Sequence, residues 1–104
     1  MTAAGFESAR FDEIIHAPNR LRICSMLSAM NEVEFAALRE ALGVSDSVLS
    51  KQLKALEDAG YLSVKKSPWE GRTRTWAALT PAGKDAFNGH VAELRRLAAG
   101  VALE

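Results

Sequence analysis

The hydrophobic pattern of this chain changes its period at Gly60, and this change constrains the fold more than any other feature. Before Gly60 the apolar residues keep the spacing of one helical face: Val48, Leu49, Leu53 and Leu56. After it, residues 61–66 and 72–76 are rich in β-forming types, and the turn markers Pro68 and Gly71 lie between them. The pattern therefore predicts a helix followed directly by a β-hairpin whose tip is at residues 67–71.

Further helices are predicted on both sides of this centre. The residues that suit helix caps, first helical turns or helix ends are Pro18, Gly43, Ser45, Thr80 and Pro81. The stretch at 31–34 interrupts the helical period and is expected to add a short strand. The predicted order is helix, helix, short strand, helix, helix, hairpin and helix, which is a mainly α fold with a β-hairpin wing.

The chain has the size and balance of one globular domain spanning residues 1–104. Its residues are 48% hydrophobic and 25% charged, which argues against disorder. No apolar run approaches the roughly 20 residues of a membrane-spanning helix, and residues 1–10 do not resemble a secretory signal. A single cysteine, Cys24, excludes an intramolecular disulfide and a cysteine-cluster zinc site. We expect a cytoplasmic protein that contacts no membrane.

The charge of the chain is balanced overall but uneven locally. Thirteen basic residues match thirteen acidic ones, which excludes a strongly basic binder of the nucleosome type. Residues 1–44 carry an excess of two negative charges, whereas residues 45–76 carry an excess of two positive charges. The positive excess therefore lies in the middle third of the chain, which holds the helix before Gly60 and the hairpin. We predict a helix-turn-helix at about 35–60 and a wing at about 61–79, followed by a C-terminal helix at about 80–100.

The second helix of this helix-turn-helix has the polar face that a DNA major groove requires. At 100° per residue, its short hydroxyls and its lysines fall in one sector, opposite the leucines. Its N-terminus could hold a phosphate, although the charge of Asp46 opposes this. Gln52 lies at the edge of the apolar arc, so its direction is open. The DNA-binding residues predicted on this helix are Ser45, Asp46, Ser47, Ser50, Lys51, Gln52 and Lys54.

The hairpin is predicted to contact DNA through four cations that bracket its tip: Lys65, Lys66, Arg72 and Arg74. An arginine near such a tip can enter the narrow, electronegative minor groove. The alternative is a solvated edge whose charges protect it against aggregation. For the helix, the corresponding alternative is an ordinary amphipathic surface helix.

These residues resemble a known family. The segments LSKQLKALEDAGY (49–61) and GRTRTW (71–76), together with residues 16–23, 35–45 and 79–83, are similar to bacterial winged-helix transcriptional regulators. The similarity is greatest to the small stand-alone group between the MarR-like and ArsR-like regulators, and it covers about residues 9 to 95. It implies a homodimer that binds double-stranded DNA at a pseudo-palindromic operator, with residues 45–54 in the major groove and 72–74 on the wing.

The resemblance also limits the chemistry to expect. Residues 35–42 contain no cysteine or histidine, so the paired-cysteine motif of ArsR-like metal sensors is missing, and we expect no metal site and no cofactor. The sequence has neither a Ser/His/Asp order nor a glycine-rich phosphate loop, which are motifs that would indicate an enzyme. The leading hypothesis is a dimeric repressor. The alternative is a winged helix that binds an acidic protein partner, and a small-molecule effector at the dimer interface stays open.

Dimerisation is predicted through the terminal helices. The last helix carries a heptad-like apolar stripe, which we expect to pack against the first helix of a partner rather than within the chain. The predicted dimerisation residues are Phe11, Ile14, Ile15, Phe87, Val91, Leu94, Ala98 and Val101.

Five other residues have plainer interpretations. Cys24 shares an apolar helical face and is expected to be buried rather than a redox sensor. His16 and His90 are far apart in sequence and are expected to be solvated or locally hydrogen-bonded. Trp76 is predicted to anchor the wing in the core, and Trp69 to stiffen the turn rather than to touch sugar and phosphate.

Overall fold

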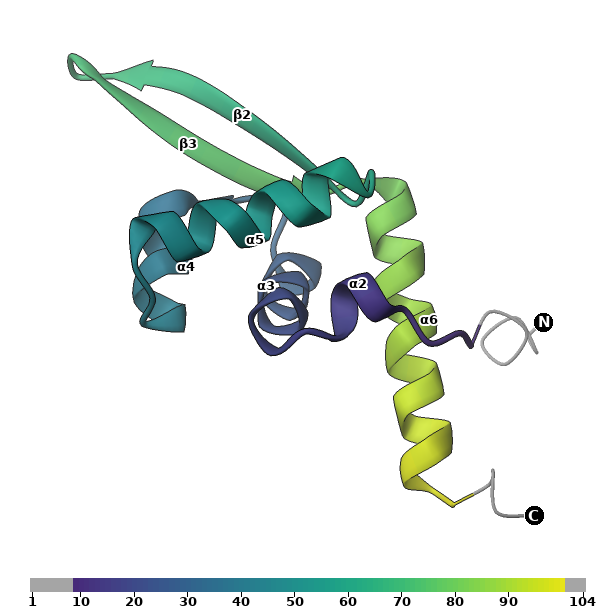
Figure 1. Ribbon diagram of the computed structural model, residues 1–104. Coiled ribbons are helices and arrows are strands. Elements are labelled where there is room, and N and C mark those ends of the chain that lie inside the picture. The colour runs from purple at the N-terminus through teal and green to yellow at the C-terminus, as the bar shows by residue number, and fades with distance from the viewer. Residues whose placement is uncertain (1–8, 101–104) are drawn as a thin grey trace.

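The computed structural model describes residues 9–100 (Figure 1). It contains, in order, α2 (Glu13–His16), α3 (Pro18–Ala29), β1 (Val33–Glu34), α4 (Phe35–Leu42), α5 (Asp46–Asp58), β2 (Leu62–Trp69), β3 (Arg72–Leu79) and α6 (Pro81–Ala98). The predicted fold class, a mainly α winged helix-turn-helix, is confirmed. Val101 lies outside the described residues.

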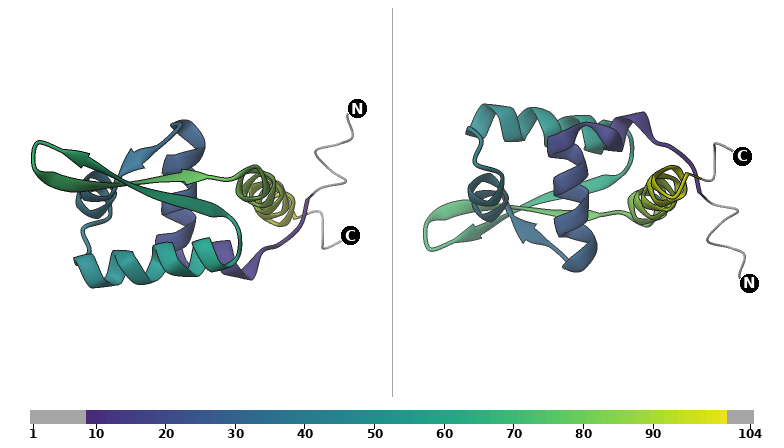
Figure 2. Two further views of the ribbon diagram at one scale, coloured as in Figure 1. Left: turned by 90° about the horizontal axis from the view of Figure 1, so that it is seen from above. Right: turned by 90° about the horizontal axis from the view of Figure 1, so that it is seen from below.

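The three strands form one antiparallel sheet in the order β1-β3-β2. Strand β1 pairs only with the root of β3, through Val33 opposite Ala77 and Glu34 opposite Trp76. Beyond this point β2 and β3 continue as a two-stranded hairpin to Trp69 opposite Arg72. Figure 2 shows the hairpin projecting from one end of the molecule, while α6 lies at the other end.

The tip of the hairpin is shorter than predicted. Glu70 and Gly71 form a two-residue turn with positive φ angles of 48° and 76°, as the type I′ turns that match the twist of hairpin strands require. The prediction of a five-residue tip at 67–71 is therefore wrong. Pro68 lies within β2, which is tolerated because β2 is an edge strand of the sheet.

The helix boundaries follow the predicted caps. Pro18 occupies the first turn of α3, and Gly43 ends α4 in the left-handed conformation with a φ of 67°. The hydroxyls of Ser45 and Thr80 accept hydrogen bonds from Val48 N and Gly83 N at the starts of α5 and α6. These local signals are all confirmed.

The core lies between α3, α4, α5 and the root of the sheet. Its fully buried side chains include Ile23, Leu38, Leu49 and Leu56. Cys24 is also fully buried, as predicted. Desolvation by burial, with a smaller effect of the Asp12 charge, raises the pKa of its thiol to about 12, so the reactive thiolate is suppressed.

Two residues predicted to contact a partner belong instead to the core of this chain. Ile15 is completely buried and Phe87 is 9% exposed. Both side chains are covered because α2 folds back between α3 and α6, and the first half of α6 packs against the sheet. The assignment of Ile15 and Phe87 to the dimer interface is therefore corrected.

The two histidines meet in a polar cluster that joins α2 to α6. Asp12 N donates to His90 Nδ1 at 2.9 Å, and the rings of His16 and His90 are linked between Nδ1 and Nε2 at 3.1 Å. Tyr61, just after α5, donates its hydroxyl to the Asp12 carboxylate at 2.5 Å. The prediction of solvated or locally bonded histidines is wrong for His90, which is completely buried and bonds residues 74 and 78 positions away, whereas His16 is exposed as predicted.

The close approach of α6 to Tyr61 depends on a glycine in the first turn of α6. A Cβ atom added at Gly83 would lie 2.1 Å from the carbonyl oxygen of Tyr61, which is backbone and cannot rotate away. The Tyr61 carbonyl also accepts a hydrogen bond from Thr80 N at 3.0 Å. The absence of a side chain at Gly83 thus allows α6 to begin directly against the link between α5 and β2.

Candidate nucleic-acid interface

The outer face of α5 is a polar surface supported by buried leucines. Leu49, Leu53 and Leu56 are buried beneath the helix. On the opposite side, the exposed residues of the predicted polar sector are Ser47, Ser50, Lys51, Lys54 and Asp58. Burial of one face fixes the helix backbone, so the other face is presented in a defined geometry, as readout of base edges requires.

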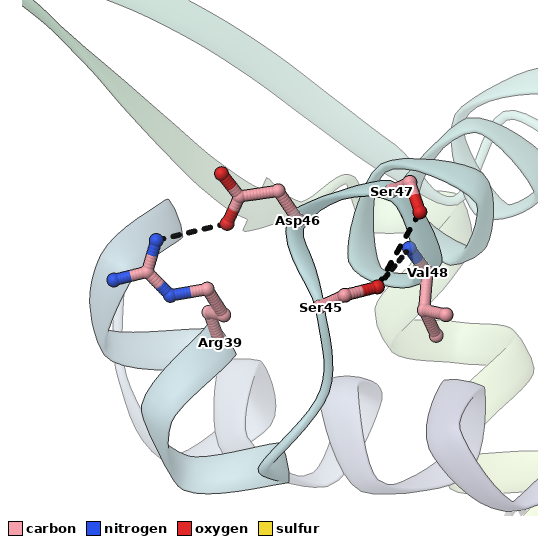
Figure 3. Close-up of polar contacts among 5 residues, drawn as sticks. All are labelled: Arg39, Ser45, Asp46, Ser47 and Val48. Atoms are coloured by element: carbon pink, nitrogen blue, oxygen red, sulfur yellow. Dashed lines mark hydrogen bonds and ion pairs between the residues drawn. The ribbon is translucent and has the colours of Figure 1, made fainter.

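An ion pair sets the start of α5 against α4 (Figure 3). Arg39 Nη1, from the last turn of α4, lies 2.8 Å from Asp46 Oδ1 in the first turn of α5. The bond to this carboxylate raises the pKa of the Arg39 guanidinium. The pair also offsets the negative charge of Asp46, which would otherwise repel a phosphate at this helix end.

The hydroxyls at this helix end are also coupled. Ser45 Oγ accepts from Val48 N at 3.2 Å and lies 3.3 Å from Ser47 Oγ (Figure 3). Ser45 is therefore occupied as a cap, whereas Ser47 still has free hydrogen-bonding capacity. Val48, predicted on the apolar face, is 36% exposed and lies at the edge of this surface.

The polar residues of α5 differ in their availability. Lys54 Nζ is 3.0 Å from Asp58 Oδ1, an exposed pair along the helix, and the bond raises the pKa of Lys54. Gln52 Oε1 accepts from Arg20 Nη1 at 2.9 Å and is half-buried, so the open question of its direction is answered: it faces α3. Within residues 9–100, Lys51 forms no ion pair.

A groove separates α5 from the hairpin. It has a volume of about 390 Å³. Ser50 and Lys54 line it from α5, and Lys66 and Thr75 line it from the hairpin. Hydroxyls and cations thus line one concave surface from both elements, together with the carboxylates of Asp46 and Glu57. The hydroxyls and cations are the groups that can contact a phosphate backbone.

The four cations of the wing do not share one surface. Side chains alternate between the two faces of a strand, so Lys66 faces the groove, while Lys65 is on the opposite face. The register places Lys65 opposite Trp76 and Trp69 opposite Arg72, so Arg72 and Arg74 share that outer face. The predicted set is therefore divided between the groove and the back of the wing.

Arg74 on the outer face is already bound within the chain. Its Nε and Nη2 donate to the two carboxylate oxygens of Glu34 at 2.7 and 2.6 Å, and these bonds lower the pKa of Glu34. The guanidinium also lies 4.4 Å from the ring centroid of Trp69 and 5.4 Å from that of Trp76. Trp76 is half-buried on this outer face and does not lie in the core, so the prediction that it anchors the wing in the core is wrong.

The remaining wing cations are more available. Lys65 Nζ makes a long, exposed contact of 3.5 Å with Glu32. Lys66 and Arg72 are exposed, and neither forms an ion pair in the part of the chain that the structure describes. Lys51, Lys66 and Arg72 are thus the cations of this end that are free to meet an anion.

Sequence reasoning did not find the residues that position this surface. Arg20, Arg39 and Glu34 lie on other elements and each binds one of the predicted DNA-binding residues. Their partners are 7 to 40 positions away. Only Arg39 and Asp46, which flank the turn between α4 and α5, are close enough for a local signal to have indicated the pair.

Two negative observations concern residues 9–100. No group of three or more histidine, cysteine, aspartate or glutamate residues there could hold a metal ion. Over the same range, no helix combines the length and apolar character needed to cross a bilayer.

Comparison with known proteins agrees with this geometry. A family model described as a winged helix DNA-binding domain matches residues 19–98. The chain belongs to this winged-helix family. A relative, an uncharacterized protein of Methanocaldococcus jannaschii, is 32% identical over 89 residues, which are 86% of this chain and 97% of that protein.

Solved structures show the same winged-helix fold. A transcriptional regulator homologue from Pyrococcus horikoshii superposes with a TM-score of 0.81 at 20% identity, covering 94% of this chain and 97% of that one. NadR, solved in complex with 4-hydroxyphenylacetate, has a TM-score of 0.65 at 21% identity, covering 97% of this chain and 74% of that one. These structures share the fold of this chain and, together with the family model, confirm the winged-helix resemblance found in the sequence.

Proposed function

We propose that this winged-helix protein is a repressor that binds a pseudo-palindromic operator as a homodimer, with α5 in the major groove and the hairpin along the adjacent backbone. The observation that carries the proposal is the outer face of α5, where Ser47, Ser50 and Lys51 are exposed above buried leucines. Short hydroxyls and a lysine without an ion-pair partner can reach base edges.

The first two turns of α5 are the region proposed to read bases. Ser47, Ser50 and Lys51 lie there, whereas Glu57 and Asp58 make the C-terminal end of the helix acidic. In helix-turn-helix proteins the N-terminal residues of the recognition helix contact base edges. Lys54 and Lys66, on the groove between α5 and the hairpin, are placed to contact phosphates.

Dimerisation is proposed through the apolar surface that remains on α2 and α6. Phe11, Ile14 and Leu97 are 42%, 40% and 44% exposed. The predicted residues Val91 and Leu94 are half-buried, and Ala98 is exposed at the far end of α6. This surface lies away from the hairpin (Figure 1), so a second copy on it would leave both recognition helices free.

The experiment is selection of bound duplexes from a random DNA pool at fixed salt, followed by sequencing. The expected result is an inverted repeat whose half-sites are about one helical turn apart, because a two-fold dimer presents two α5 helices at that spacing. Transcription in vitro from a promoter carrying the selected repeat should then decrease when the protein is added.

Two results would contradict the proposal. Recovery of a single half-site would argue against the homodimer on DNA. Failure to enrich any sequence at any salt concentration would argue against DNA reading and for the alternative, in which the basic end binds an acidic protein partner.

The proposed function includes regulation by a small-molecule effector. NadR is solved with 4-hydroxyphenylacetate, and another structure similar to this chain is the heme sensor PefR from Streptococcus agalactiae, solved with heme. By analogy, a small molecule would act here between α2, α3 and α6. Adding such compounds to the selected complex and measuring release of DNA tests this point.

A further inference from the structure

The distal part of the wing lacks the packing that holds the rest of the molecule. Strand β1 ends at Glu34, opposite Trp76, and from Thr75 to the tip the hairpin has only two strands. No side chain beyond Leu62 on β2 is buried. A two-stranded hairpin without a hydrophobic face is marginally stable at best, so the orientation of the tip depends on other contacts.

One polar contact ties this segment back to the body. Glu34, the last residue of β1, is adjacent to α4, and its carboxylate receives two parallel hydrogen bonds from Arg74 at 2.6 and 2.7 Å. Such a bidentate pair fixes both distance and orientation. The side chains of Arg74 and Glu34 are 30% and 25% exposed, so water competes for this pair less than for the exposed pairs on α5.

The same guanidinium extends the contact to the tip. Its carbon atom lies 4.4 Å above the centroid of Trp69, the last residue of β2 before the turn. Glu34, Arg74 and Trp69 therefore form a continuous chain of contacts, which we call the wing brace, from the end of β1 to the residue beside the tip. A cation over an aromatic face adds to the attraction between the strands.

We propose that Arg74 is a positioning residue of the wing, which does not itself contact DNA. It acts through Glu34 and Trp69 to hold the wing tip against DNA, with Lys66 on the groove face of the tip and Arg72 on its outer face. This inference rests on the proposed function and names which wing cations serve it. It reverses the expectation from charge alone, in which Arg74 binds phosphate and Glu34 weakens binding.

The direction in which one substitution changes the affinity for DNA separates the two roles of Arg74. Glu34→Ala removes a negative charge from the basic end. If Arg74 contacted DNA, this change would release it and tighten binding. If Arg74 positions the wing, the same change loosens the wing and weakens binding to the selected duplex by about fivefold, although the protein has become more positive.

A double-mutant cycle with Arg74→Ala completes the test. With the wing brace, the double variant binds no more weakly than Arg74→Ala alone, because both substitutions break one contact. Arg74→Lys keeps the charge but not the paired geometry, and its binding should resemble that of Arg74→Ala. Lys66→Gln is the matched control: Lys66 lies on the groove face, so the change should weaken binding and reduce the salt dependence by about one phosphate contact, with no effect on the wing brace.

A readout without DNA keeps this inference distinct from the proposed function. In the free protein, amide hydrogen exchange of residues 66–74 should accelerate in Glu34→Ala and in Arg74→Ala, but not in Lys66→Gln. Tighter or unchanged DNA binding by Glu34→Ala, or unchanged exchange in both brace variants, would overturn the role of Arg74. If wild-type protein bound no DNA while exchange still accelerated, the proposed function would fail and the wing brace would stand.

Discussion

The two ends of this molecule treat ionisable side chains in opposite ways. At the end proposed to bind DNA, which we call the DNA-facing end, Lys51, Lys66 and Arg72 are exposed on α5 and the hairpin. At the terminal end, where α2 meets α6, His90 is completely buried and Tyr61 and Asp12 are hydrogen-bonded to each other. The first arrangement keeps charges available to a ligand, while the second uses polar groups to hold helices together.

The difference has a consequence for what each end tolerates. Exposed charges that pack against nothing can be removed with little effect on folding. Buried polar groups must keep their partners, because an unsatisfied donor or acceptor in the interior is costly. Substitutions at the DNA-facing end should therefore change binding, and substitutions at the terminal end should change stability.

The largest effect is expected at the terminal end, from Gly83→Ala. Its new Cβ would lie 2.1 Å from Tyr61 O, so α6 or the link after α5 must shift. We expect a loss of about 3 kcal/mol in the free energy of unfolding, measured by urea denaturation. The exposed control Ala82→Gly should cost about 1 kcal/mol or less. Equal stability of Gly83→Ala and wild type would show that the contact between Gly83 and Tyr61 is not tightly packed.

The next effect is expected at the DNA-facing end, from Lys51→Ala. Affinity for the selected duplex should fall about tenfold, while the free energy of unfolding changes by about 0.5 kcal/mol or less. Fluorescence anisotropy and urea denaturation measure the two quantities. Lys84→Ala removes the same charge at the start of α6, beside the C-terminal end of α5 and away from its first two turns, and serves as the control. A similar loss of affinity for both variants would mean that binding responds to net charge alone.

A pH titration should distinguish the ends further. Desolvation, and secondarily the neighbouring His16, lowers the pKa of His90 in the folded state, while the charge of Asp12 acts in the opposite direction. The unfolded chain therefore binds more protons than the folded protein, so the free energy of unfolding decreases as pH falls. The free energy of unfolding should keep its full value above the unfolded-state pKa of His90, about 6.5, and should decrease as pH falls through the folded-state pKa.

Thermal unfolding between neutral and mildly acidic pH measures this effect. His90→Asn removes the titrating group but can still accept from Asp12 N, so its stability should depend less on pH than that of wild type. Direct titration of the His90 ring by NMR checks the same point in the wild-type protein. A His90 pKa at or above its ordinary value would contradict the arrangement.

The smallest effect is expected from Asp46→Asn, which weakens the only carboxylate contact described for Arg39 within residues 9–100. Stability should fall by about 0.5 kcal/mol, because an exposed pair and one charge at a helix start are lost. DNA affinity should rise about two- to threefold, since a negative charge leaves the surface of α5. Glu40→Gln on α4 changes the net charge equally. An equal rise in both would remove any special role for position 46.

Much of the fold could be predicted from local signals. The period change at Gly60, the caps at Ser45 and Thr80, and the left-handed Gly43 each act within a few residues, so each is visible in the sequence. The division of α5 into a buried and a polar face follows from helical geometry in the same way. The tip of the wing was misjudged because Pro68 is acceptable in an edge strand, and edge position is a property of the whole sheet.

The site could be predicted less completely. The exposure of the polar residues on α5 was predicted, but Gln52 and Arg74 bind Arg20 and Glu34 within the chain. Nothing in their own neighbourhood indicates this, because the partners come from α3 and β1. Ile15 and Phe87 were assigned to a partner for the same reason: an apolar stripe shows that a face is covered, not which surface covers it.

The amino-acid order thus set the elements, their ends and the polar side of α5, since backbone dihedrals, caps and periodicity are short-range. The wing brace, the meeting of His16 with His90, and the contact of Gly83 with Tyr61 arose only when those elements packed. Such contacts join residues many positions apart, and their distances are set by the burial of a shared core.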